Sequence, residues 1–473
     1  MELIRSLNGI FWGWLIAGVL LSCGIFFTVL LKAPQIRYFP KLLGNLKKDP
    51  TNRDGVSGFA ALCAAVGGQV GTGSLVGVAT ALASGGPGAI VWMWITAVLG
   101  MPINFSEAVL GQLFREKNED GTYRGGPAYY IQKGLNNKVL ATLFSISLVI
   151  GIGFIYVMIQ SNSITAALTG VVDFPPVLAG AILVVLVGTV IFGGIRRLSE
   201  ISSYIVPFMA AAYIGLALFV VIINIRLVPQ LLSTIFSEAF SFKAAAGGVA
   251  GYTIKEAFRF GIARGLFSND AGNGTTPSMH ASASVKHPVN QGLTAMLGVF
   301  TTTIIICSCT AFCILLSGAL DSGQTGIQLT QLAFANSFGG FGKWIVLFAM
   351  FLFGYTTLLA DIYYGEVSIR FILPNLKNSE LYYRILSCGL ILAGSILPVE
   401  SLWEMADFCS AFMVFFNVIA LFGLSKYVNF ALKDYQFQKA RRMETPLWNY
   451  DLDITEQYLN SKKAVEAVPA AEE

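Results

Sequence analysis

The fold of this chain is decided by the stretch Gly67-Gly68-Gln69-Val70-Gly71-Thr72-Gly73-Ser74, where glycines and polar residues interrupt a hydrophobic segment. A second interruption follows in the other half of the chain, Phe267-Ser268-Asn269-Asp270-Ala271-Gly272-Asn273-Gly274-Thr275-Thr276-Pro277. Lipid offers no hydrogen-bond partner, so irregular backbone at membrane depth survives only inside protein or along a polar cavity. The paired breaks therefore predict a binding site where they meet.

The composition places both breaks in a membrane. Hydrophobic residues make up 55% of the 473 residues, charged residues 12%, and the mean hydropathy is +0.66. Spans of roughly 20 apolar residues cross the hydrocarbon. The sequence predicts an all-α polytopic membrane protein with about 11 such helices, over 10–31, 57–83, 88–112, 139–170, 176–194, 201–224, 251–283, 290–317, 342–367, 382–398 and 401–425.

The first of these spans carries Leu20-Leu21-Ser22-Cys23, which faintly resembles a lipoprotein cleavage box. Apolar residues continue past the cysteine to Leu31, whereas a cleaved signal would give way to polar sequence. We therefore expect an uncleaved anchor helix.

Lysine and arginine indicate the orientation, because cytoplasmic loops collect them. With alternate loops on opposite sides, 24 of the 31 basic residues fall on one side. The other side holds Arg5, Arg226, Lys243 and Lys343. This split predicts an N-terminus outside and a C-terminus in the cytoplasm, in a bacterial inner membrane.

Without the first span, ten spans remain, and each group of five opens with an interrupted helix. Because five is odd, the second group enters from the opposite side, which predicts a 5+5 inverted repeat with two discontinuous helices plus one extra N-terminal helix. The tail mixes charges, and we expect it to be mobile. The predicted divisions are 1–56, 57–224, 225–250, 251–425 and 426–473.

A helix break exposes amides at one half-helix start and carbonyls at the other half-helix end. Amides bind anions and carbonyls bind cations, so a zwitterionic amino acid with an accompanying Na⁺ can use both. The alternative is that such glycines only allow close helix packing. Two polar breaks opening two halves favour the binding interpretation.

Two signatures resemble the alanine or glycine:cation symporter family, also called the sodium:alanine symporter family. The first is Gly71-Thr72-Gly73-Ser74-Leu75-Val76-Gly77-Val78-Ala79, with the runs 85–94 and 121–131; the second is Arg264-Gly265-Leu266-Phe267-Ser268-Asn269-Asp270-Ala271-Gly272, with 280–281 and 288–293. The resemblance implies a leucine-transporter-type fold and Na⁺-coupled, sometimes H⁺-coupled, uptake of small neutral amino acids. The chain departs from the family pattern at Gln69, Ser74, Asp270 and Asn273, beside the breaks.

The wider leucine-transporter group, which the first signature also resembles, implies a sodium site. It assigns the ion to the carbonyls of Gly67, Val70 and Phe353 and to the hydroxyls of Thr356 and Thr357. Hard, neutral oxygen ligands suit an alkali cation. The alternative is that each threonine only bonds to the carbonyl of the preceding turn.

The expected substrate site lies between the breaks. The substrate carboxylate should meet amides of the first break, Gln160 is a neutral amide that could reach the ligand or only join two helices, and two aromatic residues are candidate lids. The predicted substrate-binding residues are Gly71, Thr72, Gly73, Ser74, Gln160, Phe267, Ser268, Asn269 and Trp403.

Charges inside a membrane are costly and usually functional. Arg264 stands one turn before the second break, and we expect it to close an outer gate by pairing with Asp407 or Glu404. Three further acids, Glu107, Asp361 and Glu366, are either functional or reach the cytoplasmic interface.

No enzyme signature is present in the sequence. The two histidines, His280 and His287, have no metal-ligand spacing, and there is no phosphate loop or nucleophile elbow. We expect Na⁺ as the coupling ion, no organic cofactor, no nucleic-acid partner and a monomeric transport unit. An ion channel, an amino-acid sensor of the same fold and an H⁺-coupled carrier remain alternatives.

Overall fold

The computed structural model describes residues 2–45, 56–240, 254–397, 400–443 and 445–466. The predicted division between 225–250 and 251–425, and the start of the predicted span 251–283, lie outside the described residues. The described part is helical apart from one small antiparallel hairpin, in which Glu116 pairs with Arg124. Its two strands are β1 (Glu116–Lys117) and β2 (Tyr123–Arg124).

Six helical segments of the described residues are long and apolar enough to cross a membrane. A seventh is the pair Gly58–Gln69 (α5) and Gly73–Gly85, which is bent by 47° at the first break. The six comprise α7 (Ala89–Leu113), α9 to α10 (Lys138–Thr169), α12 (Gly194–Ile223), α16 to α17 (Pro288–Leu316), α19 (Phe341–Ile372) and most of α21 (Glu400–Ala440).

The chain is thus a helical membrane bundle, while the predicted number of about 11 spans stays a prediction. Four predicted spans are not among the six or seven. The apolar helices α2 (Ile16–Leu30) and α11 (Pro176–Ile191) are short, and α20 (Ser379–Ile396) carries charged residues in its first turns. The fourth is split into α14 (Ile254–Asn269) and α15 (Thr276–Ala281) by the second break.

The other elements are short. Helices of the π type interrupt the longer ones: η1 (Phe11–Leu15), η3 (Gly73–Gly77) before α6 (Val78–Gly85), η4 (Val149–Tyr156) between α9 (Lys138–Leu148) and α10 (Val157–Thr169), and η6 (Phe300–Cys307) between α16 (Pro288–Val299) and α17 (Ser308–Leu316). The connections contain α3 (Pro34–Arg37), η2 (Phe39–Lys41), α4 (Leu42–Asn45), α8 (Pro127–Gly134), η5 (Ile225–Leu227), α13 (Val228–Ala239), η7 (Ala319–Ser322) and α18 (Gly326–Phe338).

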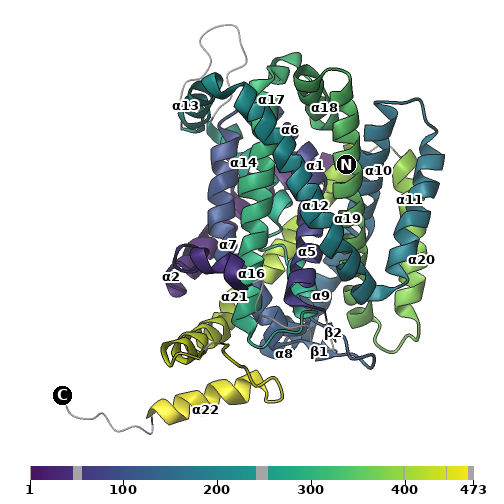
Figure 1. Ribbon diagram of the computed structural model, residues 1–473. Coiled ribbons are helices and arrows are strands. Elements are labelled where there is room, and N and C mark those ends of the chain that lie inside the picture. The colour runs from purple at the N-terminus through teal and green to yellow at the C-terminus, as the bar shows by residue number, and fades with distance from the viewer. Residues whose placement is uncertain (1, 46–55, 241–253, 398–399, 444, 467–473) are drawn as a thin grey trace.

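The two ends of the bundle carry different connections. Figure 1 shows α13 and α18 at one end, and α8, the hairpin and the C-terminal α22 (Ile454–Glu466) at the other. The segment 326–338 was not predicted as an element, because 13 residues are too short for a span. It packs against α19 and beside η3, so it borders the first break.

The N-terminal helix packs along the last long helix. From α1 (Glu2–Ile10) onward it contacts α21, and α2 contacts α7. Asn8 Nδ2 donates to the Glu404 carboxylate at 2.9 Å, and Trp12 Nε1 donates to the Asp407 carbonyl at 2.9 Å. The extra helix therefore packs against the first turns of α21, which contain Asp407.

The described part of the tail is docked, in contrast to the mobile extension expected from its mixed charges. The Trp448 ring lies 5.2 Å from the ring of His287, and the guanidinium of Arg115 lies 4.3 Å from the Tyr450 ring. Burial lowers the pKa of the His287 imidazole. Because these aromatic side chains find partners on the bundle, the tail folds back beneath it.

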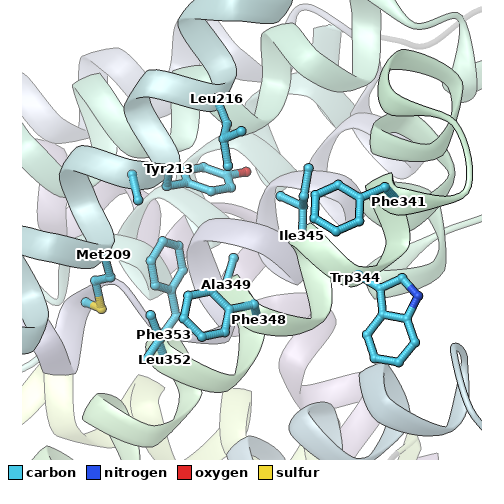
Figure 2. Close-up of a pocket in the computed structure, with 11 residues that line it drawn as sticks. Met209, Tyr213, Leu216, Phe341, Trp344, Ile345, Phe348, Ala349, Leu352 and Phe353 are labelled. Atoms are coloured by element: carbon cyan, nitrogen blue, oxygen red, sulfur yellow. The ribbon is translucent and has the colours of Figure 1, made fainter.

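An apolar groove runs between α12 and α19 on the outside of the bundle. Figure 2 shows its aromatic lining, which includes Phe341, Trp344 and Phe348. These three side chains are exposed. An apolar surface of this kind suits contact with lipid tails.

Close helix packing at a single glycine gives a direct test of the fold. A Cβ on Gly394 of α20 would lie 2.6 Å from the Cα of Met158 in α10, whereas a Cβ on Gly389 of the same helix meets nothing within 4 Å. Gly394→Val should therefore destabilise the protein by about 1–3 kcal/mol through overpacking. Thermal unfolding in detergent measures the effect.

The matched control is Gly389→Val, which should unfold at the wild-type temperature. Equal unfolding temperatures for the two variants would contradict the packing of α20 on α10.

Candidate functional site

The first break brings α5 directly against α19. A Cβ on Gly68 would lie 2.9 Å from the Cβ of Ala360, and a Cβ on Gly71 would collide with the side chain of Thr357. The glycines are therefore required by close approach as well as by the bend. Val70 is buried beside Gly71 in the bend.

Four oxygens predicted to hold Na⁺ converge at this contact. Thr357 Oγ1 lies 2.8 Å from the carbonyl oxygen of Gly67 and 2.9 Å from that of Phe353. Thr356 Oγ1 lies 3.2 Å and 3.0 Å from the same two oxygens. Both hydroxyls thus bond to the preceding turn and also reach across to α5, so the two interpretations of the threonines coexist.

The chemistry of these donors fits an alkali cation. Carbonyl and hydroxyl oxygens are hard and uncharged, as Na⁺ requires, and they lack the thiolate and imidazole groups that transition metals favour. Among the described residues, no group of three or more His, Cys, Asp or Glu side chains could hold a metal ion.

The second break lies between α14 and α15. Asp270, Gly272 and Gly274 have φ angles of +56°, +88° and +81°, in the left-handed region that glycine tolerates best. A Cβ on Gly274 would also lie 2.8 Å from the ring of Phe144. Two of the six residues of this break, Gly272 and Gly274, are therefore glycines at positions where the backbone favours glycine.

A buried carboxylate satisfies the amides of this break. Glu107 of α7 is fully buried, and its two oxygens each accept one amide at 3.1 Å, from Gly272 and Gly274. Asn417 of α21 donates to Glu107 at 2.6 Å and to the Gly272 carbonyl at 3.0 Å, and accepts from the hydroxyl of Tyr130. Glu107 therefore holds the break, and it does not reach an aqueous interface.

The two breaks touch each other. Gln69 Nε2 donates to the Asn269 carbonyl at 2.7 Å, and a Cβ on Gly73 would lie 2.8 Å from the ring of Phe267. Gln160 of α10 joins the same region, because its Oε1 accepts the Thr72 amide at 3.3 Å. This confirms that the backbone irregularities of the two halves meet.

A small polar cavity lies at this meeting point. Four predicted substrate residues line it, and Thr72 adjoins it through Gln160. The lining residues are Gly68, Gln69, Gly71, Gly73, Ile152, Tyr156, Gln160, Phe267, Asp270, Thr357 and Asp361.

Three predicted substrate residues are directed elsewhere. The hydroxyls of Ser74 and Ser268 lie 3.7 Å and 2.9 Å from the sulfur of Cys307, and Asn269 Oδ1 accepts the amide of Ala271 at 3.1 Å. These contacts join α14 and η3 to η6, so the three side chains support the wall of the site. Their role as ligands stays a prediction.

Sequence reasoning did not assign Tyr156, Asp270 or Asp361 to the cavity. Asp361 follows Thr357 by four residues, which places both on one helix face. This four-residue spacing could have identified Asp361 as a residue of the cavity from the sequence. Asp270 was singled out only as a departure from the family pattern, and Tyr156 gave no signal of its own because the chain is rich in aromatic residues.

An aromatic lid and an ion pair cover the cavity. The ring of Phe267 lies 5.2 Å from that of Tyr156 and 5.1 Å from that of Trp403. The guanidinium of Arg264 lies 5.5 Å from the Trp403 ring and pairs with the Asp407 carboxylate at 3.4 Å. Of the two predicted partners of Arg264, the structure selects Asp407.

Glu404 has different partners and belongs to the N-terminal contact. Arg5 lies 3.7 Å from its carboxylate, which also accepts from Asn8. Beyond the lid, a wider vestibule is bordered by Arg264 and Trp403 and by residues of η3, α10 and α18. Phe267 thus lines the cavity, while its neighbours Arg264 and Trp403 line the vestibule.

A bundle in which two broken helices meet at a polar cavity has the architecture of a secondary transporter of the leucine-transporter fold. The crystal structure of MhsT in complex with L-phenylalanine matches 80% of this chain and 90% of MhsT, with a TM-score of 0.58 and 14% identity. A crystal structure of the manganese transporter of Eremococcus coleocola matches 89% and 91%, with a TM-score of 0.50 and 14% identity. These likenesses show the fold.

The chain belongs to the Sodium:alanine symporter family, which it matches over residues 1–448. The "Probable sodium/glutamine symporter GlnT" of Bacillus subtilis is 40% identical, over 93% of this chain and 91% of GlnT. The "Amino-acid carrier protein AlsT" of the same organism is 39% identical, over 94% of each chain. The "Sodium/alanine symporter AgcS" of Methanococcus maripaludis is 35% identical, over 90% of this chain and 95% of AgcS. The protein is accordingly an amino-acid symporter and not an enzyme.

The role of Glu107 can be tested by removing its carboxylate. Glu107→Ala would leave the amides of Gly272 and Gly274 without acceptors, at a cost of about 1–3 kcal/mol each. We expect a lower unfolding temperature in detergent together with lost transport. Glu200→Ala, at an exposed position on α12, should change neither. A Glu107→Ala protein of wild-type stability would show that the second break does not depend on the Glu107 carboxylate.

The gate can be tested by exchanging its charges. Arg264→Asp and Asp407→Arg should each lower uptake roughly 10-fold, as expected for the loss of about 1.4 kcal/mol. The double exchange should recover much of the wild-type rate, because the two groups face each other in a partly buried site. Initial uptake rates at equal surface expression provide the measurement. No recovery in the double variant would count against the pair as a gate.

Proposed function

We propose that the protein takes up a small neutral amino acid, of the alanine, glycine or serine type, by symport with Na⁺ and alternating access. The observation that carries this proposal is the convergence of the Gly67 and Phe353 carbonyls with the Thr356 and Thr357 hydroxyls beside a polar cavity. The protein lies in the cell membrane with its N-terminus outside and its C-terminus in the cytoplasm, as the distribution of basic residues predicts.

Sodium acts as a bridge between the first break and α19. Its ligands are the carbonyls of Gly67, Val70 and Phe353 and the hydroxyls of Thr356 and Thr357. Because α5 and α19 each supply ligands, binding stabilises the arrangement in which the two helices are in contact. This is the arrangement that shapes the cavity wall at Gly68 and Gly71.

The substrate carboxylate binds the amides of Gly71, Thr72 and Gly73. In the structure the Thr72 amide is already engaged by Gln160 Oε1. An arriving carboxylate takes over this amide, and the released Gln160 oxygen then accepts an N–H of the substrate ammonium. One exchange of partners thus satisfies both charged groups of the zwitterion.

The lid couples binding to access. Phe267 follows Arg264 on α14, so the aromatic lid and the Arg264–Asp407 pair move with the outer half of the second broken helix. Opening this half admits the amino acid from the vestibule, and closing it encloses the site. The opposite opening, toward the cytoplasm, requires the inner half-helices α5 and α15 to separate from their neighbours.

Transport can be separated from the alternative functions in proteoliposomes. A panel of labelled amino acids is offered with and without an inward Na⁺ gradient, and with a pH gradient alone. Accumulation driven by Na⁺ supports symport, whereas accumulation driven only by the pH gradient means an H⁺-coupled carrier. Ion current without amino acid would mean a channel, and binding without accumulation would mean a sensor.

The sodium site has its own test. Thr356→Ala combined with Thr357→Ala removes two of the proposed ligands, and we expect it to abolish Na⁺-stimulated uptake while the protein still inserts in the membrane. Thr294→Ala is a matched control on α16, because the Thr294 hydroxyl bonds to the Asn290 carbonyl of its preceding turn. Unchanged Na⁺ dependence in the double variant would rule out this ion site.

A further inference from the structure

We infer that Asp361 and Asp270 form a side-chain subsite that selects amino acids whose side chain ends in N–H donors. This inference rests on the proposed symport at this site and extends its substrates from the alanine type to longer amino acids whose side chain carries N–H donors. The chemistry is shared by a neutral carboxamide, as in glutamine and asparagine, and a side-chain ammonium, as in lysine.

Asp361 is a buried acid that lines the cavity. It lies one helical turn beyond Thr357 on the same face of α19, and only 4% of its surface is exposed. Its Oδ2 is buried and has no hydrogen-bond partner among the described residues. A buried carboxyl oxygen without a partner is costly, so a ligand group that pairs with it gains free energy on binding.

The other buried acids identified from the sequence are already paired. Glu107 accepts the amides of the second break, and Glu366 accepts from the Arg384 guanidinium at 2.6 and 2.7 Å. Asp361 differs from both because its open oxygen borders a cavity. The contrast assigns Asp361 to ligand contact, whereas Glu107 and Glu366 hold the fold together.

Asp270 brings a second carboxyl to the same cavity from the second break. It is 8% exposed, and one of its oxygens lies 3.4 Å from Asn273 Nδ2. No ion pair found among the described residues involves Asp270 or Asp361. Arg264, the nearest basic residue in sequence to Asp270, is engaged by Asp407 and borders the vestibule.

The subsite lies where a substrate side chain would extend. The proposed carboxylate contact is at Thr72, and the proposed sodium contact is at Thr357. Asp361 continues one turn further along α19, so it is reached by atoms beyond the substrate's α-carbon. Asp361 Oδ2 has no partner among the described residues, and an N–H donor on those atoms would satisfy it.

Side chains differ sharply in what they can offer there. A carboxamide presents two N–H donors and an ammonium presents three, whereas the methyl group of alanine presents none. The carboxylate of glutamate has the shape of the glutamine amide but offers no N–H donor, and its charge would have to be buried beside two acids. Discrimination between glutamine and glutamate is thus the most specific signature of the subsite.

The test uses the full-length protein in proteoliposomes with an inward Na⁺ gradient. Unlabelled glutamine, asparagine, lysine, glutamate and glycine compete with labelled alanine. We expect glutamine, asparagine or lysine to inhibit at concentrations at least 10-fold below those needed for glycine, and glutamate not to inhibit. Inhibition by the amides identifies a carboxamide subsite, and inhibition by lysine identifies an ammonium subsite.

A substitution at Asp361 tests whether this residue is the origin of the preference for side chains with N–H donors. Asp361→Asn keeps the shape and replaces one carboxyl oxygen by an N–H donor, so it should reduce the preference for the N–H-bearing amino acid over alanine roughly 10-fold, while alanine uptake continues. Asp321→Asn, at an exposed position, is the matched control and should keep the wild-type preference.

The inference is overturned if glycine competes as well as or better than every amide and lysine, or if glutamate competes as well as glutamine. An Asp361→Asn protein with an unchanged preference would also overturn it. If that variant does not fold, the comparison of glutamine with glutamate in the wild-type protein still decides. Absence of Na⁺-driven uptake of any amino acid would instead refute the proposed function.

Discussion

The interaction on which the site depends is the capture of two backbone amides by the carboxylate of Glu107. Six residues of the second break leave helical geometry in the middle of an apolar bundle, where water cannot satisfy them. Glu107 accepts the amides of Gly272 and Gly274, and Asn417 ties both the acid and the Gly272 carbonyl to α21. These hydrogen bonds join α7, α21 and the break that follows α14. They fix the position of α14 although it ends at Asn269.

The first break relies on the second for its own placement. Gln69 donates to the carbonyl at the end of α14, and glycines at 68 and 71 let α5 lie against α19 without a side chain between them. The oxygen cluster at Gly67 and the cavity wall are consequences of this contact. Glu107, the carbonyls of the first break and the threonines of α19 thus belong to one connected site.

Much of this arrangement was predictable from sequence, because it is encoded locally. Glycine and polar residues within apolar spans indicated both breaks. The adjacent threonines Thr356 and Thr357 were predicted as sodium ligands because the family resemblance supplied their position. Arg264 was expected to meet Asp407 or Glu404, and distance selected Asp407. A charge one turn from a break is informative wherever it occurs in a membrane segment.

The remainder depends on which helix faces meet, which local patterns do not encode. Glu107 was identified only as a buried or interfacial acid, since nothing in α7 indicates that its neighbour is a broken helix. Asp361 and Tyr156 point into the cavity because of the positions of α19 and α10. The docked tail depends on contacts of Trp448 and Tyr450 with the distant Arg115 and His287.

The central claim is that the two breaks form one coupled site for Na⁺ and an amino acid. Its most direct test measures ²²Na⁺ entry into proteoliposomes while an amino acid gradient is imposed in the absence of a Na⁺ gradient. The account predicts that an inward gradient of the transported amino acid drives ²²Na⁺ accumulation, in a fixed ratio to amino-acid entry. Sodium entry that is the same with and without the amino acid would contradict it.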